Sequence, residues 1–338
     1  MTEIRSVLLD KIVKCEGRRY VEDGRLFLNA SGASLKGLFR GKSLELALRG
    51  APAVKGRNTY IRLSVDGRGK RIRLPLKEKV ISLAFEEGEH AFEIVKLNES
   101  ESNSLSVTFV RTDGEFLPVQ SEKAMKIEFV GDSITTGYGV RAKRSDEGYS
   151  VTTQDITLSY AYLTARALNA EMQIVAASGW GLYKSKYAEY AIPDFYDNVD
   201  LTRNGAKWDF SLFRPDVIVL ALGTNDFSYL GDLPKEDRAR EFSALREHFV
   251  AFTRRLLGQG AKVILLYGFS GSDKQKELPV LIDEVWREID SPDLSALQVR
   301  DAHGMNDISA GHPGKKTHRL AARRLVRLIK SILDKAAR

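Results

Sequence analysis

The chain has 338 residues, with 52 Lys and Arg against 45 Asp and Glu, and a formal net charge of +7. Its 43% hydrophobic and 29% charged residues are typical of a globular protein, and its length allows two domains. Cys15 is the single cysteine, which excludes an intrachain disulfide and a cysteine zinc cluster.

No stretch approaches the ~20 apolar residues of a membrane span, and the first residues contain no apolar signal region. The sequence as written therefore predicts a cytoplasmic protein. If a signal peptide had been removed beforehand, the remaining sequence would be the same and the protein would be secreted. The densest basic stretch, from Lys315 to Lys335, also has leucine and isoleucine at helical spacing. It indicates a solvated helix face rather than a nucleic-acid arm.

Between about residues 18 and 118, apolar residues alternate with polar ones, as in strands with one buried face. Asp66-Gly67 is a hairpin-type turn between two of these runs. Short strands separated by turns predict an antiparallel β-sandwich over residues 1–120. Its Arg- and Lys-rich polar face is a solvated surface or, as the alternative, a binding surface for an acidic polymer.

After a short linker, Phe116–Ala124, the alternation of apolar and polar residues gives way to strand-like runs separated by helical stretches. This alternation predicts a parallel sheet covered by helices on both faces, over residues 125–338. The Tyr- and Asp-rich stretch Tyr183–Arg214 is expected to be irregular. The five predicted strands are Ile127–Val130, Met172–Ala177, Val217–Leu222, Val263–Tyr267 and Leu297–Ala302. Two predicted helices lie around residues 160–168 and 242–256, the second ending at Gly258 and Gly260.

Small and polar residues follow the predicted strands where parallel strands end together. Gly131-Asp132-Ser133 follows the first strand and could place the Ser133 hydroxyl in the crevice above the sheet. Taken alone, this tripeptide is more often an Asx-type turn. Ser178-Gly179-Trp180-Gly181 follows the second strand, and Gly223-Thr224-Asn225-Asp226 follows the third. Gly311-His312-Pro313-Gly314 precedes the last helix, where Pro313 suits the first turn.

The run IEFVGDSITTGYG and the three later blocks together resemble the SGNH (GDSL-type) hydrolases. The resemblance implies that Ser133 is a nucleophile and His312 its general base. It also implies that the Ser133 and Gly179 N–H groups and Asn225 stabilise an oxyanion. No metal or organic cofactor is expected.

The fused β domain and the strings SYAYLTARAL, ASGWG and LGTNDFS look like carbohydrate esterase family two. That likeness implies a jelly-roll sandwich before a flavodoxin-like three-layer α/β/α hydrolase domain with a five-stranded parallel sheet. It implies removal of acetyl groups from xylan- or glucomannan-type carbohydrate, with a preference for the 6-hydroxyl. The expected partner is an acetylated oligo- or polysaccharide, with no nucleic acid and no membrane; a homo-oligomer is left open.

The sequence departs from the SGNH pattern three residues before His312, where these enzymes commonly carry Asp and this chain has Ser309. Asp307, Ser309 or a backbone carbonyl could orient the imidazole. If a carbonyl orients the ring, Ser309→Ala should keep most of the activity, and Ser309→Asp could gain rate, provided that the new carboxylate reaches Nδ1.

Three further residues are predicted to contact the substrate: Trp180 and Tyr267 as sugar-stacking rings, and Asp132 beside the nucleophile. Packing in the core is the alternative for the two rings, and for Phe269 near the same strand end. Two other functions remain as alternatives. The protein could be a carbohydrate-binding protein whose SGNH site has decayed, or a lipase-like acylhydrolase with a longer apolar groove.

Overall fold

The computed structural model describes residues 2–5, 13–119, 125–146, 148, 150–201, 206–269 and 275–336. Contacts between Cα atoms divide the chain into two compact units. The first is Met1–Ala124 with Ser150–Thr152, and the second is Met125–Tyr149 with Thr153–Arg338. No helix among the described residues is long and apolar enough to cross a membrane.

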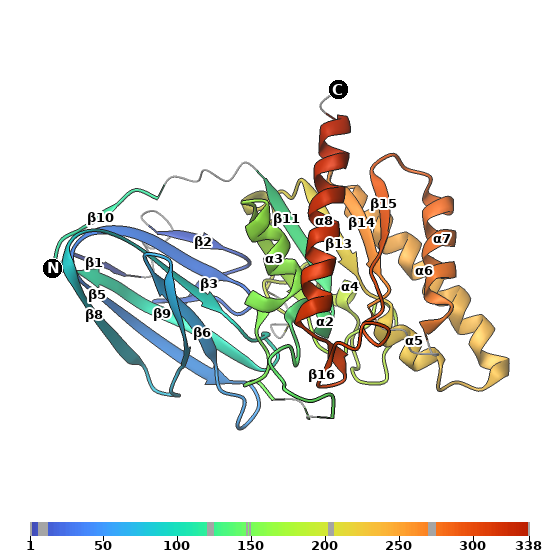
Figure 1. The fold of residues 1–338 in the computed structure, drawn as a ribbon, viewed down its shortest axis with the longest axis horizontal. Helices are drawn as coiled ribbons and strands as arrows, with labels where there is room; N and C mark the ends of the chain where they lie inside the picture. Colours follow the sequence, from blue (N-terminus) through green and yellow to red (C-terminus); the bar gives the residue numbers. More distant parts are fainter. Residues whose placement is uncertain are drawn as a thin grey trace. The chain divides into compact units, whose positions relative to one another are not determined.

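The described residues of the first unit form one antiparallel sheet of ten strands around a single apolar core. Strand β5 pairs with β8 along one edge, and with β2, β10 and β9 in turn along the other. The strands are β1 Thr2–Arg5, β2 Lys14–Glu16, β3 Tyr20–Glu22, β4 Arg25–Phe27, β5 Ser34–Pro52, β6 Tyr60–Val65, β7 Arg68–Arg73, β8 Lys79–Lys96, β9 Asn103–Thr112 and β10 Glu115–Leu117 (Figure 1).

The alternating pattern read from the sequence is present in these strands, and its alternate leucines are buried. Leu44, Leu46 and Leu48 are all fully buried in the core. The turn at Asp66-Gly67 joins β6 to β7, with positive φ at both residues, as a type I′ hairpin requires. The prediction of short strands was wrong for β5 and β8, which have 19 and 18 residues. A bulge between Gly41 and Ser43 interrupts the register of their pairing and allows the strands to bend.

The second unit contains a five-stranded parallel sheet in the order β12-β11-β13-β14-β15. Its strands are β11 Lys126–Gly131, β12 Glu171–Ala176, β13 Val217–Ala221, β14 Lys262–Tyr267 and β15 Leu294–Gln298. The first four agree with the sequence prediction, and the parallel sheet is confirmed. The fifth was predicted at Leu297–Ala302, but it begins three residues earlier. Among the described residues β15 pairs with β14 alone. Burial alternates along β15, whereas the other four strands are buried along nearly their whole length.

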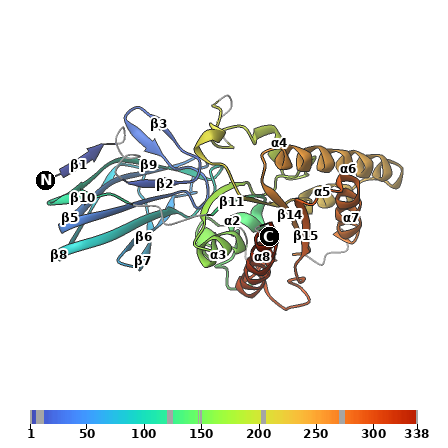
Figure 2. The same cartoon turned by 90° about the horizontal axis from the view of Figure 1, so that it is seen from above.

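Helices cover both faces of this sheet, as the alternating pattern predicted (Figures 1 and 2). Helices α3 and α8 pack together, and Tyr160 of α3 contacts Phe129 on that face. Helices α6 and α7 share the core on the other face with residues of β13 and β14. The helices are α2 Ser133–Thr136, α3 Tyr160–Ala167, α4 Ile192–Phe195, α5 Thr224–Leu230, α6 Lys235–Leu257, α7 Leu278–Ile289 and α8 Lys315–Ala336, with short 3-10 turns η1 Ile156–Leu158 and η2 Phe210–Leu212.

Candidate active site

Ser133 lies at the carboxyl end of β11, where the chain turns sharply from strand to helix. The strand ends at Gly131, and Ser133 is the first residue of the four-residue helix α2. A β-carbon at Gly131 would lie 2.0 Å from Thr135 Oγ1, so only glycine permits this close approach. The turn places Ser133 at the sheet edge where open α/β folds bind ligands.

Asp132 caps α2 from inside the protein. Its side chain is 1% exposed, and Oδ1 accepts a hydrogen bond from Ile134 N–H at 2.9 Å. Burial raises the pKa of this carboxyl to about 7, although the Ile134 N–H acts in the opposite direction. The cap orients the turn that carries Ser133. A contact between Asp132 and substrate stays a prediction.

His312 lies on a two-residue hairpin that brings it to the nucleophile. Strand β16, Ile308–Ser309, pairs with β17, His312–Pro313, through Ala310-Gly311. Both turn residues have positive φ, +50° and +70°, which is the type I′ geometry. The imidazole Nε2 lies 2.9 Å from Ser133 Oγ. The structure therefore brings together the predicted nucleophile and the predicted base.

A backbone carbonyl orients the imidazole of His312. Nδ1 lies 3.1 Å from Ala310 O, and because a carbonyl can only accept, Nδ1 must carry the proton. The lone pair of Nε2 then faces the Ser133 hydroxyl, as a general base requires. The Tyr138 ring covers the imidazole at a centroid distance of 4.1 Å. Burial lowers the pKa of His312 below its ordinary value of 6.5, which favours the neutral, basic form.

The two side chains considered as partners of His312 contact other groups. Asp307 Oδ2 accepts hydrogen bonds from Thr317 N–H at 2.6 Å and Thr317 Oγ1 at 2.9 Å, in the first turn of α8. Ser309 Oγ lies 2.7 Å from Gly139 O and 2.8 Å from Ala142 O. A carboxylate introduced by Ser309→Asp would replace a hydroxyl that contacts two carbonyl oxygens, which argues against its reaching Nδ1; the effect of this variant stays a prediction.

Gly179 and Asn225 follow the two strands that flank β11. Gly179 has φ +83°, a conformation that favours glycine. Asn225 is buried in the first turn of α5, and its Nδ2 donates to Trp180 O at 2.8 Å. The same Nδ2 lies 3.4 Å from Asp132 Oδ2. Asn225 thus links the cap of Ser133 to the loop that contains Gly179.

The predicted sugar-stacking rings are largely enclosed. Trp180 is 5% exposed, and its ring packs against Tyr190 and Phe195. Tyr267 is partly buried at the end of β14, and burial raises the pKa of its hydroxyl. Phe269 is also buried. These positions favour the alternative of core packing for Trp180 and Phe269, and stacking on sugar stays a prediction for Tyr267.

Tyr187 and Asp226, like Tyr138 on the imidazole, were not singled out from the sequence. Tyr187 is 62% exposed and lies against Gly179, where a β-carbon would be 3.0 Å from that of Tyr187. Asp226 is buried and binds the backbone of the loop after Gly179. The available signals were the Tyr-rich composition of the stretch from Tyr183 onward and the position of Asp226 directly after Asn225.

Two family models match the chain. The GDSL-like Lipase/Acylhydrolase family matches residues 129–291, and the Carbohydrate esterase 2 N-terminal model matches residues 15–119. The chain is also 28% identical over 337 residues to an acetylxylan esterase / glucomannan deacetylase of Cellvibrio japonicus. That alignment covers 96% of this chain and 90% of the relative.

Solved structures give the same result. A family two carbohydrate esterase from Cellvibrio japonicus has a TM-score of 0.86 and 27% identity, covering 98% of each chain. A family two carbohydrate esterase from Clostridium thermocellum, in complex with cellohexaose, has a TM-score of 0.86. Its 23% identity, over 95% of this chain and 99% of that one, supports the fold alone. The chain therefore has a Carbohydrate esterase 2 N-terminal match followed by a GDSL-like Lipase/Acylhydrolase match, and over almost its whole length it is similar to family two carbohydrate esterases.

Proposed function

We propose that this protein is a serine esterase that removes O-acetyl groups from an oligo- or polysaccharide. The observation that carries the proposal is the 2.9 Å contact between Ser133 Oγ and His312 Nε2. The proton on Nδ1 is bound by a carbonyl, so Nε2 is free to accept the Ser133 proton. A hydroxyl paired in this way with a neutral imidazole is suited to attack an ester carbonyl.

The reaction proceeds through an acetyl-enzyme. Ser133 Oγ bonds to the acetyl carbonyl carbon while its proton passes to His312 Nε2. The tetrahedral intermediate then collapses, and the sugar oxygen leaves with that proton. Water next attacks the acetyl-enzyme, gives a proton to His312, and releases acetate when the Ser133 oxygen departs and recovers a proton.

Three donors are assigned to the oxyanion: Ser133 N–H, Gly179 N–H and the Asn225 amide. Asn225 has two N–H groups on Nδ2, and one of them donates to Trp180 O. Within the described part of the chain, the second N–H has only the 3.4 Å contact with Asp132 Oδ2, which is longer than an ordinary hydrogen bond. It is therefore available to an oxyanion. Removing one such donor typically lowers kcat by about 10²–10³-fold.

The relative from Cellvibrio japonicus is an acetylxylan esterase / glucomannan deacetylase, which supports acetylated xylan or glucomannan as the substrate class here. The exposed Tyr187 ring beside Gly179 supports a sugar acceptor as well, because aromatic faces bind the apolar faces of ligands. Within this class we assign the 6-O-acetyl group of hexose units as the preferred ester.

The test of the reaction is acetate release from acetylated glucomannan and xylan, together with labelling by a fluorophosphonate probe. Wild type should release acetate and be labelled, and Ser133→Ala should do neither. A wild-type protein that binds glycan but is never labelled would instead be a binding protein. Faster hydrolysis of p-nitrophenyl octanoate than of the acetate would indicate a lipase-like enzyme.

The test of the sugar site is Tyr187→Ala, with Tyr190→Ala as the matched exposed tyrosine on the same loop. Loss of one stacked ring should raise KM for acetylated oligosaccharide about 10-fold, on the scale of ~1.4 kcal/mol per factor of ten. KM for p-nitrophenyl acetate, which has no sugar, should stay unchanged. Equal changes for both substrates would contradict a sugar-binding role for Tyr187.

A further inference from the structure

Asp226 is a buried carboxylate that the esterase mechanism does not use directly. It is 1% exposed and follows Asn225 in the first turn of α5. Oδ2 accepts a hydrogen bond from Leu182 N–H at 2.9 Å. Oδ1 accepts two, from Tyr183 N–H at 2.7 Å and from Lys184 N–H at 3.0 Å. Burial raises the pKa of this carboxyl, and the three N–H groups counteract that change.

The backbone of the Gly179 loop, residues 177–184, surrounds this carboxylate closely. A β-carbon at Gly181 would lie 2.7 Å from Asp226 Oδ1 and 2.7 Å from Lys184 O. Asn225 Nδ2 binds the same loop at Trp180 O. Two consecutive side chains of α5 therefore bind the loop at four backbone positions, directly after Gly179.

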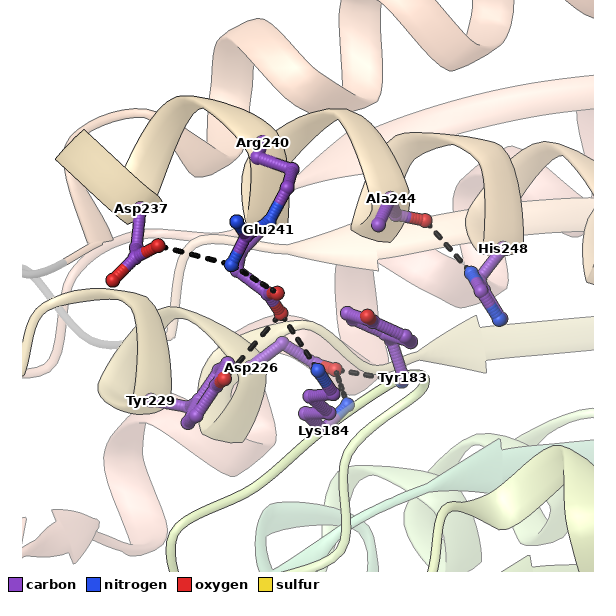
Figure 3. A network of polar contacts seen from close by, with 9 residues as sticks. All are labelled: Tyr183, Lys184, Asp226, Tyr229, Asp237, Arg240, Glu241, Ala244 and His248. Atoms are coloured by element: carbon purple, nitrogen blue, oxygen red, sulfur yellow. Dashed lines mark hydrogen bonds and ion pairs between the residues drawn. The ribbon is translucent and has the colours of Figure 1, made fainter. Parts of the chain in front are cut away.

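A second layer of contacts lies outside this one and is drawn in Figure 3. Lys184 Nζ pairs with Glu241 Oε2 of α6 at 2.8 Å, and Tyr229 Oη donates to the same oxygen at 3.3 Å. The Tyr183 ring packs on His248 of α6 at 4.3 Å. The positive charge of Lys184 is thus directed to Glu241, while Asp226 contacts the loop through backbone N–H groups.

We propose that Asp226 is a positioning residue that fixes the Gly179 loop, and with it the Gly179 N–H, for the oxyanion. The inference rests on the esterase function proposed above. A donor acts on the transition state only where it is fixed in advance, and a displacement of about 1 Å can cost ~10²-fold in rate. The contribution of Asp226 is therefore to kcat, since the loop contacts involve no substrate atom.

Asp226→Asn tests the inference because it keeps the shape and changes one acceptor into a donor. The new amide NH₂ must face at least one backbone N–H, so the loop cannot keep all three hydrogen bonds. Glu128→Gln is the matched control. Like Asp226, Glu128 is a buried carboxyl, but it lies in strand β11, and it accepts hydrogen bonds from Gln173 Nε2 at 2.5 Å and from Tyr196 Oη.

The measurements are kcat and KM for p-nitrophenyl acetate, and inhibition by a small boronic acid, which forms a tetrahedral adduct on serine. Asp226→Asn should lower kcat about 10- to 100-fold, with KM within about 3-fold. Its affinity for the boronic acid should fall by a similar factor. Glu128→Gln should keep wild-type kcat. Wild-type kcat and boronate affinity in a folded Asp226→Asn would overturn the inference.

Gly181→Ala gives the same test without altering a charge, should Asp226→Asn fail to fold. The new β-carbon would lie 2.7 Å from Asp226 Oδ1 and would push the loop away from this carboxylate. The variant should therefore lower kcat about 10-fold, again with little change in KM. Unchanged kcat in this variant would also overturn the inference.

Ser133→Ala is measured beside the two loop variants, Asp226→Asn and Gly181→Ala. If Ser133→Ala retains turnover, the esterase proposal itself fails; if it is inactive while both loop variants match wild type, only the role of Asp226 fails.

Discussion

The two halves of the candidate active site are fixed by different kinds of groups. On the Ser133 side, buried carboxyls bind the backbone: Asp132 caps α2, and Asp226 binds the loop after Gly179. On the His312 side, the ring contacts neutral groups, namely the Ala310 carbonyl and the Tyr138 ring. Asp307, the carboxylate nearest in sequence, binds the start of α8 instead.

This difference determines how each half responds to charge. A carbonyl stabilises an imidazolium less than a carboxylate does, and burial also favours the neutral ring. The surroundings of His312 therefore favour the neutral form of the ring. The Ser133 half depends on acceptor oxygens. Both oxygens of Asp226 bind backbone N–H groups, so this carboxyl cannot be exchanged for an amide without loss of a backbone hydrogen bond.

The largest effect on stability is expected from Ser309→Asp. Ser309 is 6% exposed, and its hydroxyl lies between the carbonyl oxygens of Gly139 and Ala142. A carboxylate there would be buried against two acceptors, at a cost of about 3 kcal/mol or more. Thermal melting should show a large loss, with a smaller one for Ser309→Ala. A stable Ser309→Asp variant with raised kcat would mean that this side chain reaches the imidazole.

The pH profile provides a second test. The base must be neutral, and the pKa of His312 is lowered, so activity rises with pH through a midpoint below 6.5. The measurement is kcat/KM for p-nitrophenyl acetate between pH 4 and 8. Asp132 has a pKa raised to about 7, so Asp132→Asn is the control, and its acid midpoint should also lie below 6.5. A midpoint above 6.5 in both proteins would indicate a carboxylate partner for the ring.

The smallest effect is expected from Ala310→Gly. The partner of Nδ1 is the main-chain carbonyl, which this change leaves in place. The positive φ of Ala310 costs about 1–2 kcal/mol that glycine avoids, and the greater chain entropy of glycine offsets about 0.5–1 kcal/mol. We expect unchanged kcat and a small rise in melting temperature. A 10-fold loss of kcat would mean that the Ala310 methyl, rather than the carbonyl, determines the position of the ring.

Features that depend on local sequence were the predictable ones. The apolar runs identified four of the five parallel strands, because buried parallel strands are apolar throughout. The edge strand β15 alternates instead, and it was placed three residues late. Helix α7, Leu278–Ile289, was not predicted.

The hydrogen-bond partners that depend on the course of the backbone could not be predicted from the sequence. The blocks around Ser133 and His312 indicated the pair, but not which group would face Nδ1. That choice follows from positive φ at Ala310, a residue that seldom adopts it. The role of Asp226 depends on three N–H groups that are 42 to 44 residues distant in the chain, and the exposure of Tyr187 depends on the course of the same loop.

The most direct test of the account is kcat for acetyl-ester hydrolysis in Ser133→Ala, His312→Ala, the double variant and Asp307→Asn. If Ser133 and His312 act as one unit, as proposed, each single variant should lose several orders of magnitude, and the double variant little more. Asp307→Asn should stay within a few-fold of wild type, since its carboxylate caps α8. Near wild-type turnover in Ser133→Ala would contradict the account, as would a loss of ~10⁴ in a folded Asp307→Asn, the scale expected for a triad acid.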